Sequence, residues 1–219
     1  MKMIHKIKRT LISTALFISA SSFAAPNSEE LIEAIETADF TMVESLVRYG
    51  VDPNEGVSLY NTTPLMYAVE VGSIEVVNTL LKHGSDVDMV DHFGNTPLIH
   101  AINANQDEIA SLLINQSRRI NTKTEHGTTA LHSAAKQGNE SLFKKILIKG
   151  GSLEAHDNFG NNTLFYAIAG RNRNIINTLV QLNYFDLSHV NTSGESALKV
   201  AQRHGLQDVA NFITKGRNR

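Results

Sequence analysis

Apolar residues in this chain recur with the spacing of amphipathic helices, and the same pattern returns along most of the sequence. A Leu-x-x-Ala unit occurs five times, and each copy follows a Thr, Ser or Asn that can cap a helix N-terminus. Leu31 and Ala34 form a further copy upstream. Leu and Ala three positions apart lie on one helix face, so each unit predicts a first helix. The five leucines are Leu65, Leu98, Leu131, Leu164 and Leu198, which sets a period of 33 residues and once 34.

A second apolar stripe follows each unit and predicts a second helix in every repeat. It begins as Val76, Val77, Leu80 and Leu81 and recurs at the same spacing in the later copies. Left-handed residues are predicted to end the first helices, because glycine adopts that conformation at little cost. These positions are Gly72, Gly138 and Gly205, with Asn105 and Arg171 in the other two copies.

The period predicts an all-α repeat solenoid of stacked helix-turn-helix repeats joined by short extended loops. About six repeats fill residues 25–215, the last of them short, and a basic tail follows at 216–219. The predicted repeats are 29–61, 62–94, 95–127, 128–160, 161–194 and 195–215.

The repeat resembles that of ankyrin-repeat proteins, from about residue 29 to residue 215. The segments GNTPLIHA at 94–101, GSIEVVNTLLKHGSDVD at 72–88 and GTTALHSAAKQGN at 127–139 carry the resemblance. The family's His after the leucine occurs once, as His132, which is expected to brace its helix turn through hydrogen bonds. Met66, Ile99, Phe165 and Lys199 take its place elsewhere, so those repeats are expected to depend more on apolar packing.

The resemblance implies that β-hairpin loops join the repeats, and that the hairpin tips and exposed positions on the first helices form a partner-binding surface. Aromatic and His side chains at these positions are typical of binding hot spots. The candidate partner-binding residues are Tyr67, His92, Phe93, His100, His126, Phe159 and Tyr166, and variable positions further round are Glu70, Asn103, Lys136 and Arg203. The family pattern makes positions 67 and 166 exposed. Alternatively, the aromatic side chains at the hairpin tips pack against the neighbouring hairpin.

The first 24 residues have the pattern of a bacterial secretory signal peptide. A cationic start precedes an apolar run of roughly ten residues, too short for a helix that spans a bilayer. Ser22 and Ala24 place small residues before a predicted cleavage site near Ala24. We therefore expect a periplasmic or secreted protein, with an uncleaved signal anchor as the alternative.

The composition limits the kinds of catalytic and ligand-binding site that the chain can form. The chain has no Cys, which excludes disulfides and thiolate sites, and neither metal-ligand spacing nor a nucleotide or nucleophile motif occurs. No catalytic residue, metal or cofactor is predicted. The net charge of the whole chain is −2, and residues 25–219 hold 16 basic and 22 acidic residues, a net charge of −6. This charge makes nucleic acid or an anionic membrane surface a poor match for the chain as a whole.

The leading hypothesis is an exported module that binds a protein, monomeric until bound and without membrane insertion. An inhibitor or immunity-type partner of an exported enzyme is the most concrete form of this hypothesis. A secreted effector that binds a host protein and an envelope scaffold are the alternatives, and a concave polar cluster would be needed to support an enzyme. The acidic charge favours a basic partner.

Overall fold

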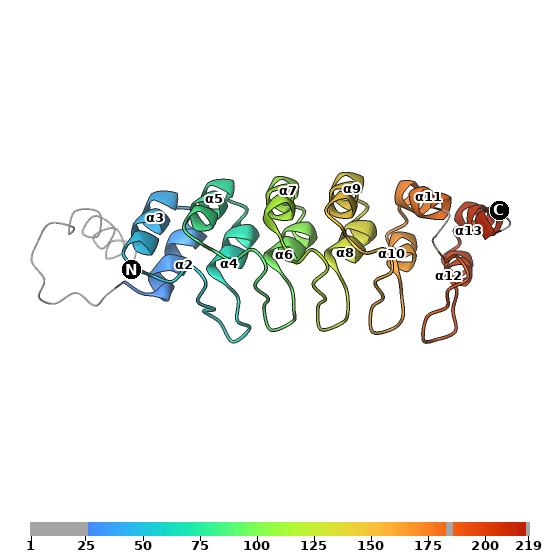
Figure 1. Cartoon of the computed structure of the whole chain (residues 1–219), viewed down its shortest axis with the longest axis horizontal. Helices are drawn as coiled ribbons and strands as arrows, with labels where there is room; N and C mark the ends of the chain where they lie inside the picture. Colours follow the sequence, from blue (N-terminus) through green and yellow to red (C-terminus); the bar gives the residue numbers. More distant parts are fainter. Residues whose placement is uncertain (1–25, 183–185, 218–219) are drawn as a thin grey trace, which may run out of the picture.

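The computed structural model describes residues 26–182 and 186–217, which form two layers of short helices in an extended row (Figure 1). The described residues contain twelve helices and no regular strand, which confirms the all-α repeat solenoid. The predicted signal peptide and the end of the basic tail lie outside the described residues. Within the described part of the chain, no helix has the length and apolar character needed to cross a membrane.

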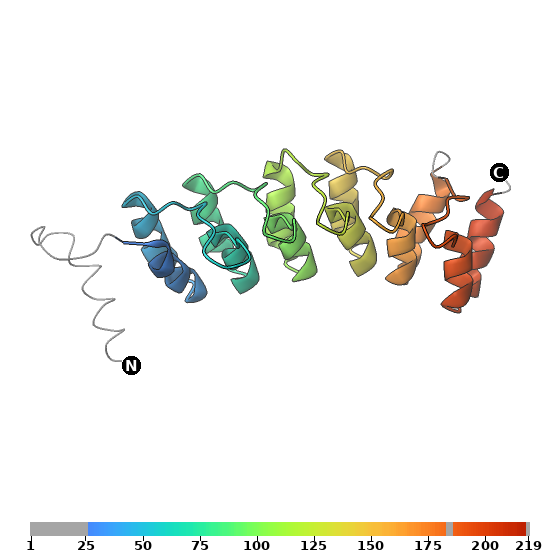
Figure 2. The ribbon, with the colours of Figure 1, turned by 90° about the horizontal axis from the view of Figure 1, so that it is seen from below.

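Six helix pairs follow one another along the row, and each pair places one helix in each layer (Figures 1 and 2). The inner layer, beside the hairpin loops, consists of α2 (Ser28–Glu36), α4 (Pro64–Val71), α6 (Pro97–Asn103), α8 (Ala130–Gln137), α10 (Thr163–Ala169) and α12 (Ala197–Arg203). The outer layer consists of α3 (Phe40–Arg48), α5 (Ile74–Lys82), α7 (Asp107–Gln116), α9 (Glu140–Ile148), α11 (Arg173–Gln181) and α13 (Gln207–Arg217).

The inner helices begin at the capping residues that the sequence predicts. Thr63 Oγ1 accepts a hydrogen bond from the Met66 backbone N–H at 3.4 Å. Thr96, Thr129 and Ser196 accept the corresponding bond in their repeats, and Asn162 caps α10 through the Leu164 N–H. These caps satisfy backbone donors that the first turn of a helix leaves without a partner.

The predicted left-handed residues separate the two helices of each pair. Asn105 and Arg171 both have φ of 56°, although neither is glycine, and Gly72 has φ of 77°. The outer helix α7 lacks a glycine at its end, and Ser117 is extended there with φ of −61°. The buried Asp88 carboxylate compensates, because it accepts hydrogen bonds from Ser117 Oγ at 2.6 Å and from the Arg118 N–H at 2.9 Å.

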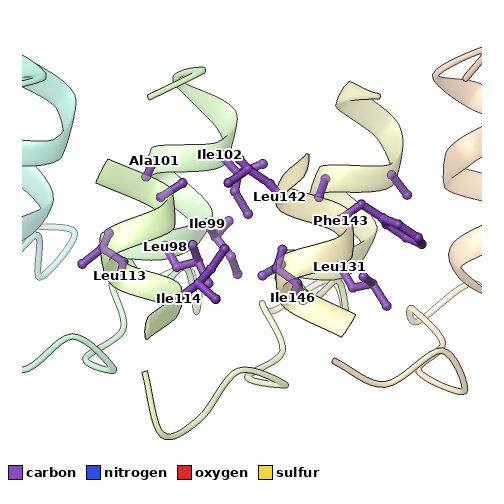
Figure 3. Packing of buried hydrophobic residues seen from close by; sticks show 14 of the residues in the cluster. Leu98, Ile99, Ala101, Ile102, Leu113, Ile114, Leu131, Leu142, Phe143 and Ile146 are labelled. Carbon is purple, nitrogen blue, oxygen red and sulfur yellow. The ribbon is translucent and has the colours of Figure 1, made fainter. Parts of the chain in front are cut away.

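One continuous hydrophobic core runs between the layers, from Leu31 to Ile213. Figure 3 shows the core between the third and fourth repeats, where α6, α7, α8 and α9 contribute side chains to the same space. Leu131 and Phe143 are each 1% exposed. Burial of one such side chain contributes about 1.5–3 kcal/mol, so stability comes mainly from the interfaces between neighbouring repeats.

In the parts of the hairpin loops that the structure describes, there are no regular strands, but backbone hydrogen bonds join the loops to one another. Backbone hydrogen bonds close each loop on itself, such as Asp91 N–H to Asn95 O and Gly94 N–H to Asp91 O, both at 3.0 Å. Each loop also bonds to the preceding one, through donors His92, Glu125, Asn158 and Thr192 and acceptors Tyr60, Phe93, His126 and Phe159, at 2.7–2.9 Å. The hairpin tips are therefore held in register as a row.

Candidate functional site

The first hairpin tips form an exposed apolar surface. Leu59 is 97% exposed, Tyr60 55% and Phe93 40%. The Tyr60 and Phe93 rings stack with centroids 5.4 Å apart, and His92 meets the edge of Phe93 at 5.8 Å. We call these four residues the tip ledge. Phe93 thus packs against the neighbouring hairpin, as the alternative interpretation predicts, but part of its ring remains exposed to solvent.

The sequence pattern singles out His92 and Phe93 but does not indicate Leu59 and Tyr60. These two residues lie in the loop before the second repeat, which carries one extra residue and interrupts the period. An apolar dipeptide in an otherwise polar loop is the signal that could have identified them.

The later tips carry His126 and Phe159, which are also exposed. Phe159 is 62% exposed, and its backbone is held on both sides: Asp157 Oδ1 accepts from the Phe159 N–H at 2.8 Å, and the Phe159 carbonyl accepts from the Thr192 N–H at 2.9 Å. His126 lies 3.5 Å from Glu125 Oε1. Their hairpins are joined through the backbone row, so these side chains continue the line of the tip ledge.

His100 on α6 is half-buried and held by acidic neighbours on both sides of its ring. Its Nε2 lies 2.9 Å from Asp91 Oδ2, and its Nδ1 lies 3.4 Å from Glu70 Oε1. Burial acts to raise the pKa of Asp91, but hydrogen bonds from Asn95 and from His100 outweigh it and leave that pKa below its usual value. Much of the His100 hydrogen-bonding capacity is therefore used inside the protein.

Tyr166 on α10 is the corresponding residue two repeats later and is also tied down. Its hydroxyl donates to Asp157 Oδ2 at 2.8 Å, and its ring stacks on His132 with centroids 4.6 Å apart. Burial, together with the hydrogen bond to Asp157, raises the pKa of the Tyr166 hydroxyl. Tyr67 is likewise half-buried and packs against the core. Positions 67 and 166 are thus less exposed than the family pattern suggests, because both rings cover core side chains.

His132 has the bracing role that the resemblance implies. Its Nδ1 accepts from the Thr129 N–H at 3.3 Å, and its Nε2 donates to the Ala155 carbonyl at 3.1 Å, which joins α8 to the next hairpin. Burial lowers the pKa of His132 to about 4, so the ring is neutral near pH 7. In the second repeat Met66 Sδ takes the first of these bonds, from the Thr63 N–H at 3.5 Å.

Beside the tips, two adjoining hollows form a trough along the inner helices from α6 to α12. One has a volume of about 320 Å³ and the other about 430 Å³, and Lys136 and Tyr166 line both. Asn103 and Ser133 lie in the second hollow, whereas Arg203 lies in the first, where Glu195 binds its guanidinium through both oxygens at 2.7 and 2.9 Å. The trough therefore contains three of the four predicted variable positions.

A close approach of two helices shapes the middle of the trough. Gly170 follows α10 with ordinary backbone geometry, but a Cβ there would overlap the Lys136 carbonyl oxygen of α8. Glycine at this position lets the two helices pack closely and holds Lys136 beside Tyr166. The sequence pattern does not reveal this requirement, because the corresponding positions Ala104 and Gln137 carry side chains.

Charge is divided unevenly along the row of repeats. Residues 25–117 hold 15 acidic and 2 basic residues, a net charge of −13, and we call them the acidic half. Residues 118–219 hold 7 acidic and 14 basic residues, a net charge of +7, and we call them the basic half. The tip ledge belongs to the acidic half, and most of the trough belongs to the basic half. Among the described residues, no three His, Asp or Glu side chains gather as metal ligands would.

Comparison with known families gives a match over most of the chain. A family model described as ankyrin repeats (3 copies) matches residues 13–91, 83–157 and 131–218. The three matched ranges overlap and together include every helix described above.

Known proteins match over shorter segments. The phosphate system positive regulatory protein PHO81 of Saccharomyces cerevisiae is 42% identical over 57 residues, 26% of this chain and 5% of that protein. The 2-5A-dependent ribonuclease of Mus musculus is 37% identical over 60 residues, 27% of this chain and 8% of that protein. The putative ankyrin repeat protein FPV244 of Fowlpox virus is 28% identical over 87 residues, which are 40% of this chain and 13% of that protein. The chain spans only a small part of each relative's length.

Proposed function

Because the chain belongs to the ankyrin-repeat family, whose repeats are protein–protein interaction modules, we propose that it binds a partner protein along the trough and the tip ledge. The family is typically non-catalytic. The observation that carries the proposal is a line of exposed apolar and aromatic side chains on hairpin tips that backbone hydrogen bonds hold in register.

The hairpin tips are already ordered before a partner binds, and this favours binding by their surface. The tips are joined to one another at 2.7–2.9 Å, so little loop entropy is lost when a partner covers them. Tyr60 and Phe93 offer large apolar area with few rotatable bonds, as binding hot spots do. Among the residues that the structure describes, no carboxylate lies within 4.0 Å of Lys136 in the trough, so its ammonium group is available to an acidic group of the partner.

The charges specify the partner more closely than the net charge does. The tip ledge lies in a half of net charge −13, so the partner's surface there is expected to be basic with an apolar centre. At the trough, Lys136 is expected to contact an acidic group at the opposite end of the partner. A partner with charges in this order binds in one direction along the solenoid.

The biological form of this proposal is an exported inhibitor or immunity-type partner of an exported enzyme. The action is steric, because a rigid surface that covers about 800 Å² of the enzyme can block access to its active site. The signal-like residues 1–24 support export, and the apolar tips support tight binding of one partner.

The test is capture of partners from envelope and secreted fractions with tagged residues 25–219, followed by assay of any captured enzyme. Stoichiometric capture of one exported enzyme whose activity falls on binding is the expected result. Capture of a host protein alone would replace the inhibitor with an effector. Capture of several envelope proteins without loss of activity would replace it with a scaffold.

Two surface variants show whether the captured partner uses the proposed surface. Tyr60→Ser with Phe93→Ser is expected to weaken binding at least tenfold, because hot-spot side chains contribute about 2 kcal/mol or more each. Lys136→Gln is expected to weaken it by a smaller factor. Ile148→Asn on the outer layer serves as the control and keeps full affinity. Equal loss in all three variants would contradict the surface assignment.

Export is tested separately by the mass of the protein recovered from cell fractions. Cleavage near Ala24 and recovery outside the cytoplasm are expected. An intact N-terminus on a cytoplasmic protein would overturn the exported form of the proposal while leaving protein binding in place.

A further inference from the structure

The outer layer carries a large apolar side chain that the core does not use. Ile148, the last residue of α9, is 87% exposed, whereas Ile146 is fully buried. Residues two apart on a helix point in nearly opposite directions, so Ile148 points away from the core. The corresponding residues of the neighbouring repeats are Asn115 and Gln181, both polar. The repeat therefore does not require an apolar residue at this position.

Exposed cations gather around Ile148. On α9 itself, Lys144 and Lys145 lie one turn before it and Lys149 follows it. The last turn of α7 and the segment after it lie against the end of α9, because Lys149 Nζ donates to the Asn115 carbonyl at 2.7 Å and Asn121 Nδ2 donates to the Gly150 carbonyl at 2.9 Å. The segment between these two contacts supplies two more exposed cations. We call the group the outer basic patch: Ile148, Lys144, Lys145, Lys149, Arg118 and Arg119.

The patch is not neutralised by its surroundings. Within the described part of the chain, none of its five cations has a carboxylate oxygen within 4.0 Å. The acidic residues of the same two helices, Asp107, Glu108 and Glu140, lie in the first turns, at the opposite end from Ile148. Residues 118–149 as a whole hold 7 basic and 2 acidic residues, a net charge of +5.

We propose that the outer basic patch docks the protein on an anionic phospholipid surface, with Ile148 among the headgroups and the cations facing lipid phosphates. Clustered lysines and arginines are attracted to anionic leaflets, and an apolar side chain beside them adds a second, independent contribution. The net charge of the whole chain conceals this patch, because the acidic half outweighs it. Docking by the outer layer leaves the trough and the tip ledge facing away from the lipid.

A lipid surface fits the shape of the patch better than other polyanions do. Ile148 projects from the outer layer, and a protein partner would have to supply a fitted pocket for it, whereas a headgroup layer accommodates it without one. The six residues include no aromatic side chain, so the bases of single-stranded nucleic acid find no stacking platform. Duplex nucleic acid matches the cations but offers Ile148 nothing apolar.

The experiment is co-sedimentation of residues 25–219 with lipid vesicles. This form retains every residue of the core cluster, from Leu31 to Ile213, and circular dichroism checks its fold. Vesicles of phosphatidylcholine with about 30% phosphatidylglycerol are compared with vesicles of phosphatidylcholine alone. Binding to the anionic vesicles only, weakened when the salt concentration rises from about 0.1 M to about 0.5 M, is expected.

Matched variants locate the contact. Lys144→Gln, Lys145→Gln and Lys149→Gln together are expected to lower the partition coefficient about 100-fold, since each neutralised cation costs about fivefold. The control changes the net charge equally through Lys82→Gln, Lys199→Gln and Lys215→Gln, which all lie outside the patch, and it keeps most of the binding. Ile148→Asn, which installs the residue of the preceding repeat, is expected to lower binding about tenfold without loss of fold.

Several results would overturn the proposal. They are absence of binding to anionic vesicles, equal binding to both vesicle types, and equal losses in the patch variant and the control variant. Duplex DNA and polyglutamate are tested in parallel. Binding to either of these with the same loss in the patch variant, and none to vesicles, would assign the patch to a nucleic acid or to an acidic protein instead.

Discussion

The acidic half and the basic half of the solenoid share one buried pattern and differ almost everywhere else. Leu65 and Leu131 occupy the same place in their repeats, and each is 1% exposed. The acidic half presents apolar tips, whereas the basic half presents a trough on one side and Ile148 among cations on the other. The repeat constrains only its core, caps and turns, so surface chemistry can change from one repeat to the next without cost to the fold.

The comparison extends to the polar braces of the two halves. His132 joins its own cap to the next hairpin through two ring nitrogens, whereas Met66 can satisfy only the cap. The basic half therefore contains a titratable brace that the acidic half lacks at the corresponding position. Four predictions test such matched pairs, from the largest expected effect to the smallest.

Phe143→Ala is expected to give the largest loss of stability, about 3–5 kcal/mol in the free energy of unfolding. Phe143 is 1% exposed and points toward the fifth repeat, so truncation leaves a cavity at a repeat interface (Figure 3). The corresponding residue of the acidic half is Ala110, which is fully buried without such a ring. Urea unfolding measures the change. A loss below about 1 kcal/mol would show that the interface closes around the cavity.

Lowering the pH is expected to destabilise the protein through His132. Its pKa is about 4 in the folded protein, below the usual value of 6.5, so the unfolded chain binds more protons between these values. The contribution of His132 to the free energy of unfolding is complete above about pH 6.5 and is lost as the pH falls through about 4. The total loss is up to about 3 kcal/mol.

Unfolding free energies of the wild type and His132→Met between pH 7 and pH 4 isolate this effect. The variant installs the residue of the second repeat and is expected to show a flatter pH profile in this range. Identical profiles for the two proteins would show that other groups cause the acid sensitivity.

Gly170→Ala is expected to cost about 1–3 kcal/mol, because the new Cβ meets the Lys136 carbonyl and forces α8 and α10 apart. The reciprocal change in the acidic half, Ala104→Gly, removes a methyl group at an exposed helix end and is expected to cost at most about 1 kcal/mol. Thermal unfolding compares the two variants. An equal or smaller loss for Gly170→Ala would mean that the two helices separate readily at the trough.

Tyr166→Phe is expected to cost about 1 kcal/mol, because it removes the hydroxyl that donates to Asp157 and leaves the stacked ring in place. Tyr67→Phe is the matched change in the acidic half. Its hydroxyl has no hydrogen-bond partner among residues 26–182 and 186–217, so the effect of removing it is expected to be near zero. Chemical unfolding of both variants measures the difference. Equal effects would remove the distinction between the two tyrosines.

Much of the fold could be predicted from the chain alone, because its period, capping residues and left-handed positions each follow local rules. Thr63, Thr96, Thr129 and Ser196 cap helices where the pattern places them, and Asn105 and Arg171 adopt the left-handed conformation. The candidate site was predictable only in part. His92, Phe93, His126 and Phe159 lie on exposed tips, whereas His100 and Tyr166 use their polar atoms internally.

The sequence by itself determined the repeat, its two helices and the side chains that form the core, since these depend on residues close together along the chain. Only the tertiary structure decided which surface positions meet. Tyr60 reaches Phe93, Lys136 shares a hollow with Arg203, and Lys149 reaches the Asn115 carbonyl, each across a repeat boundary. Stacking brings residues about 33 positions apart into contact, so surfaces formed across repeats follow from packing rather than from any local pattern.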